Sequence, residues 1–341
     1  MVKYGYTRSG KQRWYCPKCR VTSTKTRPDI IKKKWGRLFT HWLLSNISLT
    51  QLSKKLKIGK RTLNYHFQSI WKQFKQELST YRVYVSTYNQ NTSTQQITQK
   101  TKVRVIILDA TYVRRDYVVL IAKDLTHILG FGFYQKENYN SWCDFLTKLF
   151  PYPQLYPDIV VIDGKQGLML ALRSVFEDKV KIQRCLFHIH LLFRTYLSLK
   201  PKTKAGKELK CLVDQLSRVT TKSAMSSWLL RFFLWFSFYQ PLLLKTPHPK
   251  KKNKADKPVW RYKHKKLRAA FSLIKNSLPY LFTFLYHPDV PRTTNHVEAG
   301  INARLKELIY RHRGLSKTKQ KILISLFLKS KMKNQHESLF N

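Results

Sequence analysis

The chain has 341 residues, with 65 Lys and Arg against 18 Asp and Glu, and its formal net charge is +47. Such a surplus repels itself unless a polyanion neutralises it, so we expect a nucleic acid as partner. Codon bias in an A/T-rich gene would enrich Lys but also Glu, which is scarce. The 43% hydrophobic and 13% aromatic content excludes a disordered basic tail and predicts a core divided into two or three units.

Nothing in the sequence predicts a membrane protein. The N-terminus is basic and polar, without the apolar stretch of a signal peptide. The most apolar run, 228–244, is interrupted by Arg231, Gln240 and Pro241, which favours a buried helix over a membrane span. Five scattered cysteines do not suggest a disulfide framework. We therefore expect a cytoplasmic, nucleoid-associated protein.

Residues 1–30 form a basic region that contains Cys16 and Cys19. Their C-x-x-C spacing is that of half a zinc knuckle, whereas a closed structural zinc site needs four ligands. No second pair lies nearby. Structural zinc and a reduced pair without metal therefore both stay open.

Residues 31–85 have the pattern of a helix-turn-helix. Leu49, Leu52 and Leu56 share one helical face, and Ile58-Gly59 suit a turn before a second helix. We expect Gly59 to supply the tight backbone of this turn. The second helix would present side chains to phosphates and base edges in a major groove: Lys60, Arg61, Thr62, Asn64 and Tyr65. The alternative is an ordinary helical hairpin.

Residues 86–102 are polar and predict a linker, after which strands and helices alternate. Strands are expected at 103–110, 117–122, 128–134, 158–163 and 180–183, with helices at 138–150 and 165–176. A three-strand meander followed by helix, strand, helix and strand is the order of an RNase H-like α/β fold. From 188 to 286 the pattern is helical apart from a basic loop at 248–257, and a further helix is expected at 295–310.

Two acids stand at the ends of these apolar strands. Asp109 follows a Val-Ile-Ile-Leu run and Asp163 follows Ile-Val-Val-Ile. A carboxylate at the end of a buried strand is costly unless it binds something positive. If the two strands are neighbours, the carboxylates meet at one oxygen-rich spot of the kind that Mg²⁺ prefers.

Four short motifs resemble those of the Mutator-like superfamily of DDE transposases, most closely its bacterial insertion-sequence branch. They are Leu-Asp-Ala-Thr-Tyr-Val around Asp109, Asp-Gly-Lys-Gln-Gly-Leu from Asp163, Cys-Leu-Phe-His from Cys185 to His188, and Asn-His-Val-Glu ending at Glu298. The likeness covers about residues 103–315. The half-knuckle and helix-turn-helix resemble that branch too.

The resemblance implies that Asp109, Asp163 and Glu298 bind two Mg²⁺ ions, for which Mn²⁺ can substitute, and that Cys185 and His188 lie near the active site. It implies an RNase H-like core at 103–190 and 287–315, a helical insertion at 191–286 and a basic C-terminal helix or tail at 316–341. The protein would bind the terminal inverted repeats of an element, cut there and join the ends to target DNA. A homo-oligomer is expected because two ends must be held together.

Structural roles remain as alternatives for several of these residues. Glu298 has the spacing of a capping box behind Asn295, and Asp163 could cap a strand-to-helix turn. Cys185 and His188 could be core residues. Four cations on or after the Glu298 helix are expected to contact the DNA backbone: Arg304, Lys306, Arg311 and Arg313.

Two other functions remain open. One is a catalytically inactive DNA-binding regulator or decayed transposase copy. The other is a nuclease or resolvase of the RNase H-like group that cuts without joining. The helix-turn-helix favours recognition of specific element ends, which a general nuclease does not need.

Overall fold

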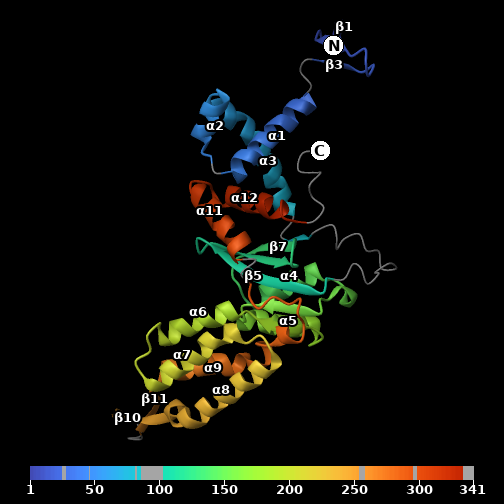
Figure 1. Cartoon of the computed structure of the whole chain (residues 1–341). Helices are drawn as coiled ribbons and strands as arrows, with labels where there is room; N and C mark the ends of the chain where they lie inside the picture. The colour runs from blue at the N-terminus through green and yellow to red at the C-terminus, as the bar shows by residue number, and fades with distance from the viewer. Residues whose placement is uncertain are drawn as a thin grey trace. The chain divides into compact units, whose positions relative to one another are not determined.

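The computed structural model describes residues 1–24, 28–45, 47–80, 83–85, 103–252, 258–294 and 298–332 (Figure 1). Two compact units are present, one made of Met1–Arg82 with Arg304–Asn341 and the other of Val83–Ala303. The predicted linker at 86–102 lies outside the described residues, as do 333–341 of the predicted tail.

The first unit begins with a small antiparallel sheet of β1 (Val2–Tyr6), β2 (Gln12–Tyr15) and β3 (Thr22–Thr24). Sequence analysis predicted only a basic region here. All five residues of β1 are exposed, and its alternation of Val2, Tyr4 and Tyr6 with Lys3 and Gly5 is too short to distinguish a strand from a loop.

Five helices complete this unit: α1 (Pro28–Leu44), α2 (Leu49–Leu56), α3 (Lys60–Thr80), α11 (Ala303–Arg311) and α12 (Lys317–Lys329). The buried ring of Phe39 on α1 contacts three rings of α3, those of Phe67, Trp71 and Phe74. This aromatic cluster fixes α1 against α3.

A capping box starts α2. The Ser48 hydroxyl accepts a hydrogen bond from the Gln51 backbone N–H at 3.2 Å, and the Gln51 side chain accepts one from the Ser48 N–H at 2.7 Å. The turn into α3 corrects one expectation. Lys57, and not Gly59, adopts the left-handed conformation, with φ 54°, where its N–H closes the end of α2.

The second unit contains a six-stranded mixed sheet in the order β4-β7-β6-β5-β8-β9. Its strands are β4 (Val83–Val85), β5 (Val105–Val113), β6 (Tyr117–Lys123), β7 (Ile128–Tyr134), β8 (Ile159–Ile162) and β9 (Lys181–Arg184). Strands β4 to β7 pair antiparallel, whereas β5, β8 and β9 pair parallel. The α/β class is confirmed. The short edge strand β4 was not predicted, because three residues carry too little periodicity.

Two helices, α4 (Tyr139–Leu149) and α5 (Gln166–Phe176), pack on one face of this sheet. The sheet contributes Ile106, Leu108, Val160 and Ile162 to the shared core, and the helices contribute Trp142, Phe145, Leu146, Leu168 and Leu172. Because side chains alternate across a strand, the odd-numbered residues of β5 and β8 lie on the opposite face.

Four long helices follow the sheet: α6 (Leu186–Leu197), α7 (Lys204–Gln215), α8 (Lys222–Leu243) and α9 (Lys265–Ser277). The buried indoles of Trp228 and Trp235 on α8 donate hydrogen bonds to the carbonyls of Leu212 at 2.8 Å and Ala205 at 3.0 Å. Each indole thus fastens α8 to α7. None of the described helices has the length and apolarity needed to span a bilayer.

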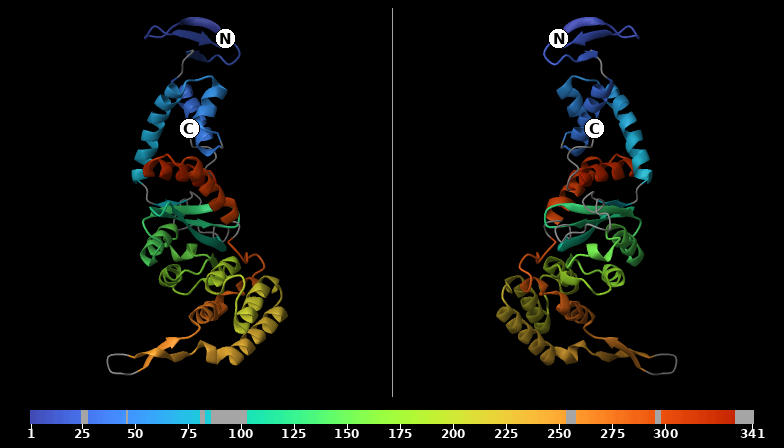
Figure 2. Two further views of the ribbon diagram at one scale, coloured as in Figure 1. Left: turned by 90° about the vertical axis from the view of Figure 1, so that its left-hand side faces the viewer. Right: turned by 90° about the vertical axis from the view of Figure 1, so that its right-hand side faces the viewer.

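Between α8 and α9 the chain forms an antiparallel hairpin of β10 (Lys245–Lys252) and β11 (Pro258–Tyr262) that extends away from the helices (Figure 2). The expected basic loop at 248–257 is therefore partly wrong, because its first residues belong to β10. Short helical turns occupy Pro153–Leu155, Leu216–Arg218, Leu278–Tyr280, Thr283–Leu285 and Glu298–Asn302, the last a π-helix where a continuous α-helix was predicted.

Removing the Phe145 ring should destabilise the second unit. Phe145→Ala empties a fully buried position between α4 and the sheet, and we expect a loss of about 3–5 kcal/mol in the free energy of unfolding. Leu170→Ala on α5, where the side chain is 47% exposed, is the control and should cost less than about 1 kcal/mol. Urea titration followed by circular dichroism measures both; equal losses would contradict the core assignment.

Candidate functional site

The parallel pairing of β5 and β8 places two carboxylates side by side. The register runs from Val105 opposite Ile159 to Ile107 opposite Val161. Continued by two residues, it sets Asp109 level with Asp163 on the same face, on strands about 4.8 Å apart. Both residues are buried, with 6% and 9% exposure. They lie on the face opposite the α4 and α5 core.

Cys185 extends this row onto the next strand. In the β8–β9 pairing Ile162 stands opposite Arg184, and the Cys185 N–H donates to the Ile162 carbonyl at 2.8 Å. The next step of the register sets Cys185 beside Asp163. Three neighbouring strands thus bring two carboxylates and a thiol to one line.

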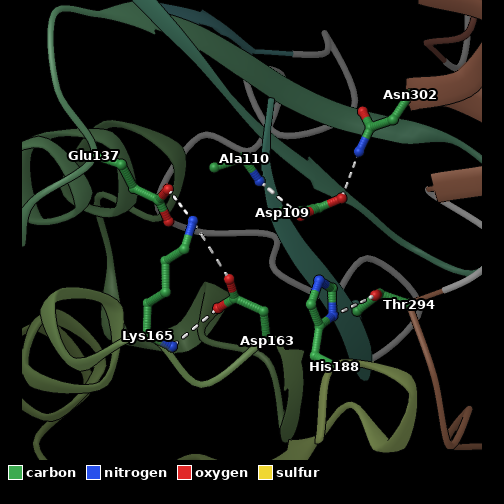
Figure 3. A network of polar contacts seen from close by, with 8 residues as sticks. All are labelled: Asp109, Ala110, Glu137, Asp163, Lys165, His188, Thr294 and Asn302. Carbon is green, nitrogen blue, oxygen red and sulfur yellow. Dashed lines mark hydrogen bonds and ion pairs between the residues drawn. The ribbon is translucent and has the colours of Figure 1, made fainter. Parts of the chain in front are cut away.

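Hydrogen bonds from Ala110 and Asn302 hold the Asp109 carboxylate. The Ala110 N–H donates to Oδ1 at 2.8 Å, and the Asn302 amide Nδ2 donates to Oδ2 at 2.6 Å (Figure 3). Asn302 is 5% exposed, and its own Oδ1 is buried with no hydrogen-bond partner among the described residues. A carbonyl oxygen is therefore left open beside this carboxylate.

The Asp163 carboxylate faces a lysine. The Lys165 N–H donates to Oδ1 at 3.0 Å, and the Lys165 ammonium lies 3.6 Å from Oδ2 while it also pairs with Glu137 (Figure 3). The Glu137 side chain is 2% exposed, and its Oε1 is buried without a described partner. Burial lowers the pKa of Lys165, but Glu137 and Asp163 outweigh it, so the pKa is raised and the ammonium stays charged.

Gly164 joins these two residues and cannot carry a side chain. Its φ is +83°, and a Cβ there would lie 2.1 Å from Nε of Arg184. Arg184 is buried, and Nη1 donates to the Ser277 hydroxyl at 2.5 Å. Burial lowers the pKa of this guanidinium, and the nearby Asp163 opposes that effect. The Arg184 side chain thus fills the space next to Gly164, in the turn that follows Asp163.

Thr294 ties the segment before Glu298 to the start of α6. Its N–H and hydroxyl donate to the Cys185 sulfur at 3.2 and 3.3 Å, and its hydroxyl lies 3.5 Å from Nδ1 of His188. Burial raises the pKa of the Cys185 thiol, whereas hydrogen bonds with His188 and Thr294 lower it. The hydrogen bonds together outweigh burial, so the pKa of Cys185 lies below its ordinary value. The candidate residues Cys185 and His188 are therefore brought together beside Asp163.

Only the backbone of Glu298 is described. It begins the π-helix that ends at Asn302, whose side chain contacts Asp109. Asn295, His296 and Val297 lie outside the described residues, as does the Glu298 side chain. The main chain of Glu298 therefore starts the short helix whose last residue, Asn302, contacts Asp109.

The oxygen-rich donor set suits a hard divalent cation. Two neighbouring carboxylates and the open Asn302 carbonyl are ligands of the type that Mg²⁺ and Mn²⁺ take. Within the described side chains, which exclude that of Glu298, no cluster of three or more His, Cys, Asp or Glu is arranged around a metal position. The carboxylates of Asp109 and Asp163 and the Asn302 carbonyl have the donor chemistry that suits such an ion.

Glu137, Lys165 and Asn302 were not predicted as site residues from the sequence. The available signal was that Glu137 is one of only 18 acids and directly precedes Asn138, which caps α4. Lys165 lies inside the Asp-Gly-Lys-Gln-Gly-Leu motif but was not singled out, because lysine is abundant here, and Asn302 gave no signal, because its partner lies 193 residues away.

The predicted DNA-contacting side chains are placed in the first unit. All five on α3 are exposed: Lys60, Arg61, Thr62, Asn64 and Tyr65. Lys306 and Arg313 are exposed as well, whereas Arg304 and Arg311 both pair with Glu307. Arg304 also donates to the Leu44 carbonyl at 3.2 Å, so it has a structural contact on α1.

Cys16 and Cys19 lie in the turn between β2 and β3. Hydrogen bonds from the Cys19 backbone, the Cys19 side chain and the Lys18 backbone lower the pKa of Cys16, which favours its thiolate. A turn of this kind suits zinc, yet no third and fourth ligand accompany the pair among the described residues.

Residues 90–237 match the family described as Transposase, Mutator family. The matched stretch contains the motifs of Asp109, Asp163, Cys185 and His188, and it ends before Glu298. No curated protein matches the chain.

Gly164→Ala should disturb the site, because the new methyl group would overlap Arg184 in a backbone conformation that L-residues avoid. We expect a loss of about 1–3 kcal/mol in the free energy of unfolding. Gly314→Ala is the control, since a Cβ there meets nothing within 4 Å. Urea denaturation compares the two, and an unchanged Gly164 variant would show that the turn is not constrained.

Proposed function

We propose that this Mutator-family transposase uses Asp109, Asp163 and Glu298 to cut DNA at the ends of a mobile element and to join the freed ends to target DNA. The observation that carries the proposal is the pair of buried carboxylates set level on one face by the β5–β8 register. The chain has only 18 acidic residues, and two of them are buried next to each other on neighbouring strands.

The sheet order supports an RNase H-like core as part of this proposal. Strands β7, β6 and β5 form an antiparallel meander, and β8 and β9 extend it parallel to β5. Asp109 lies on the central strand of that arrangement, and Asp163 directly follows its parallel neighbour. This is the α/β order that sequence analysis expected, with β4 added at the edge.

The reaction makes and breaks one phosphorus–oxygen bond in each step. In the first, a water oxygen attacks the phosphorus at the element end, and the leaving oxygen becomes a 3′-hydroxyl. In the second, that hydroxyl attacks a phosphorus of target DNA. The bond from this phosphorus to the target's own 3′-oxygen breaks, and the freed oxygen becomes a 3′-hydroxyl. Two divalent cations, when bound by Asp109, Asp163 and Glu298, would activate the attacking oxygen and relieve charge on the leaving oxygen.

The chain's own residues would hold the carboxylates ready. The Asn302 amide fixes Oδ2 of Asp109, and the Lys165 N–H fixes Oδ1 of Asp163, so neither carboxylate is free to rotate. The Lys165 ammonium, held by Glu137, supplies a positive charge beside Asp163. Charges so fixed reduce the reorganisation needed when a phosphate enters.

Recognition of the element ends is proposed for α2 and α3. The five exposed side chains at the start of α3 combine two cations with amide and hydroxyl groups, which can contact both phosphates and base edges. Leu52 and Leu63 are buried behind them and keep the two helices together.

Loss of any one of the three carboxylates should abolish cleavage. Asp109→Asn, Asp163→Asn and Glu298→Gln should each lower Mg²⁺-dependent nicking and joining of labelled DNA carrying the gene's flanking sequence by roughly 100-fold or more, since loss of a partner of a metal ligand alone costs about 10- to 100-fold. Asp178→Asn is the control, because that side chain is 83% exposed and lies outside the proposed site. EDTA should have the same effect on the native chain.

The opposite results are equally informative. Tight binding without metal-dependent cleavage by the native chain would favour an inactive DNA-binding regulator or a decayed copy. Cleavage without joining would favour a nuclease or resolvase.

Substitutions on α3 should weaken discrimination between DNA sequences. Arg61→Ala and Asn64→Ala should each reduce the preference for an element end over a scrambled duplex by about 1–3 kcal/mol, because base contacts are lost. Lys72→Ala, which removes an exposed cation farther along α3, should leave the preference unchanged. Competition fluorescence anisotropy measures the preference; equal effects in all three variants would contradict base contact by α3.

A further inference from the structure

A cavity of about 900 Å³ lies in the helical part of the second unit, away from the carboxylates. One wall is the end of α6 and the loop into α7, from Arg194 to Thr203. The other wall is the end of β11 and the first turn of α9, from Trp260 to Leu267.

The lining of this cavity is strongly cationic. Seven of its 17 described residues are Lys or Arg, and none of the 17 is acidic: the cations are Arg194, Lys200, Lys202, Arg261, Lys263, Lys265 and Lys266. All seven are exposed, and none has an ion-pair partner among the described residues. Their charges are therefore left for a ligand to neutralise.

The overall charge of the chain does not explain this lining. A second cavity of the same unit, about 810 Å³ between β9 and α8, is lined by two such cations, Arg173 and Lys181, and includes Asp178. The rest of that lining is largely apolar or aromatic. The 900 Å³ cavity thus has seven Lys or Arg residues in its lining, whereas the 810 Å³ cavity has two.

The arrangement of these cations suits a chain of phosphates better than a single anion. They come from two walls and are spread over α6, the loop after it, β11 and α9. The first turn of α9 has no side-chain cap, which adds backbone N–H groups to the same wall. Repeated phosphates can pair with several such groups at once.

An exposed indole lies among the cations. Trp260 is 60% exposed, although a tryptophan is costly to leave in water, and it lines the same cavity wall as the β11 and α9 cations. A cationic groove with an aromatic ring is the combination that binds a nucleic-acid backbone and stacks an unpaired base. The ring therefore offers a stacking face beside the cations.

We propose that this cavity is a DNA-binding site, in which Lys263, Lys265 and Lys266 contact backbone phosphates and Trp260 stacks on an unpaired base. It is separate from the α3 surface and from the carboxylates. It extends the proposed function, because it gives the helices that follow the sheet, α6 to α9, a contact with DNA.

The first test removes two of the cations. Lys265→Gln with Lys266→Gln should reduce the slope of log affinity against log salt concentration by about 2 for a random-sequence duplex or single strand, as expected for two lost phosphate contacts. The matched control, Lys207→Gln with Lys275→Gln, removes the same charge from α7 and α9 outside the cavity lining. Equal slopes in the two double variants would overturn the proposal.

A second measurement uses the native chain, so folding of a variant does not enter. Lysine acetylation followed by mass spectrometry should show that DNA protects Lys263, Lys265 and Lys266 at least several-fold more than Lys207 and Lys275. Uniform protection, or none in the cavity, would contradict binding there.

Trp260→Ala tests the stacking contact. It should weaken binding of a single strand about tenfold or more, in line with 1–3 kcal/mol for one stacked base, and should change duplex binding little. An equal effect on both forms of DNA would exclude stacking. Asp109→Asn separates this proposal from the proposed function, because it should abolish cleavage and leave the salt slope and the lysine protection unchanged.

Discussion

The parallel register between β5 and β8 is the constraint on which the proposed chemistry depends. It brings Asp109 and Asp163 to one level inside a sheet whose other face is closed by α4 and α5. Two like charges so close would repel, and each loses its water on burial. The Asn302 amide and the Lys165 ammonium offset that cost, and Glu137 holds the ammonium in place. The repulsion between the two carboxylates is thus opposed by the Lys165 charge and the Asn302 hydrogen bond.

The cations of the chain serve different purposes according to their burial. Lys165 and Arg184 are tied to the turn around Gly164 and help to shape the site. Arg304 and Arg311 stabilise α11 through Glu307. The cations at the start of α3 and around the 900 Å³ cavity are exposed. Net charge alone predicts a polyanionic partner, whereas the distribution of ion pairs separates the cations that hold the fold from those that remain available.

Sequence predicted the parts of the fold whose side chains repeat regularly. The apolar runs that became β5 to β9 were found to within about three residues at each end, because buried strands need uninterrupted β-branched and aromatic side chains. Strands β1 to β4 and the β10–β11 hairpin were missed, since they are short, exposed or rich in lysine. Asp109 and Asp163 could be predicted because an acid at the end of an apolar strand is rare. Glu137, Lys165 and Asn302 could not, because tertiary contacts alone give them their place.

The hydrogen bond between Asn302 and Asp109 joins residues 193 positions apart, and Thr294 reaches back 109 positions to Cys185. Contacts of such long separation form late, after the intervening chain has closed on itself. A ribosome would release the sheet and all four long helices before Asn302 emerged. Asp109 therefore stays without its amide partner through most of synthesis, and a chain terminated early would carry two carboxylates in a site that is never completed.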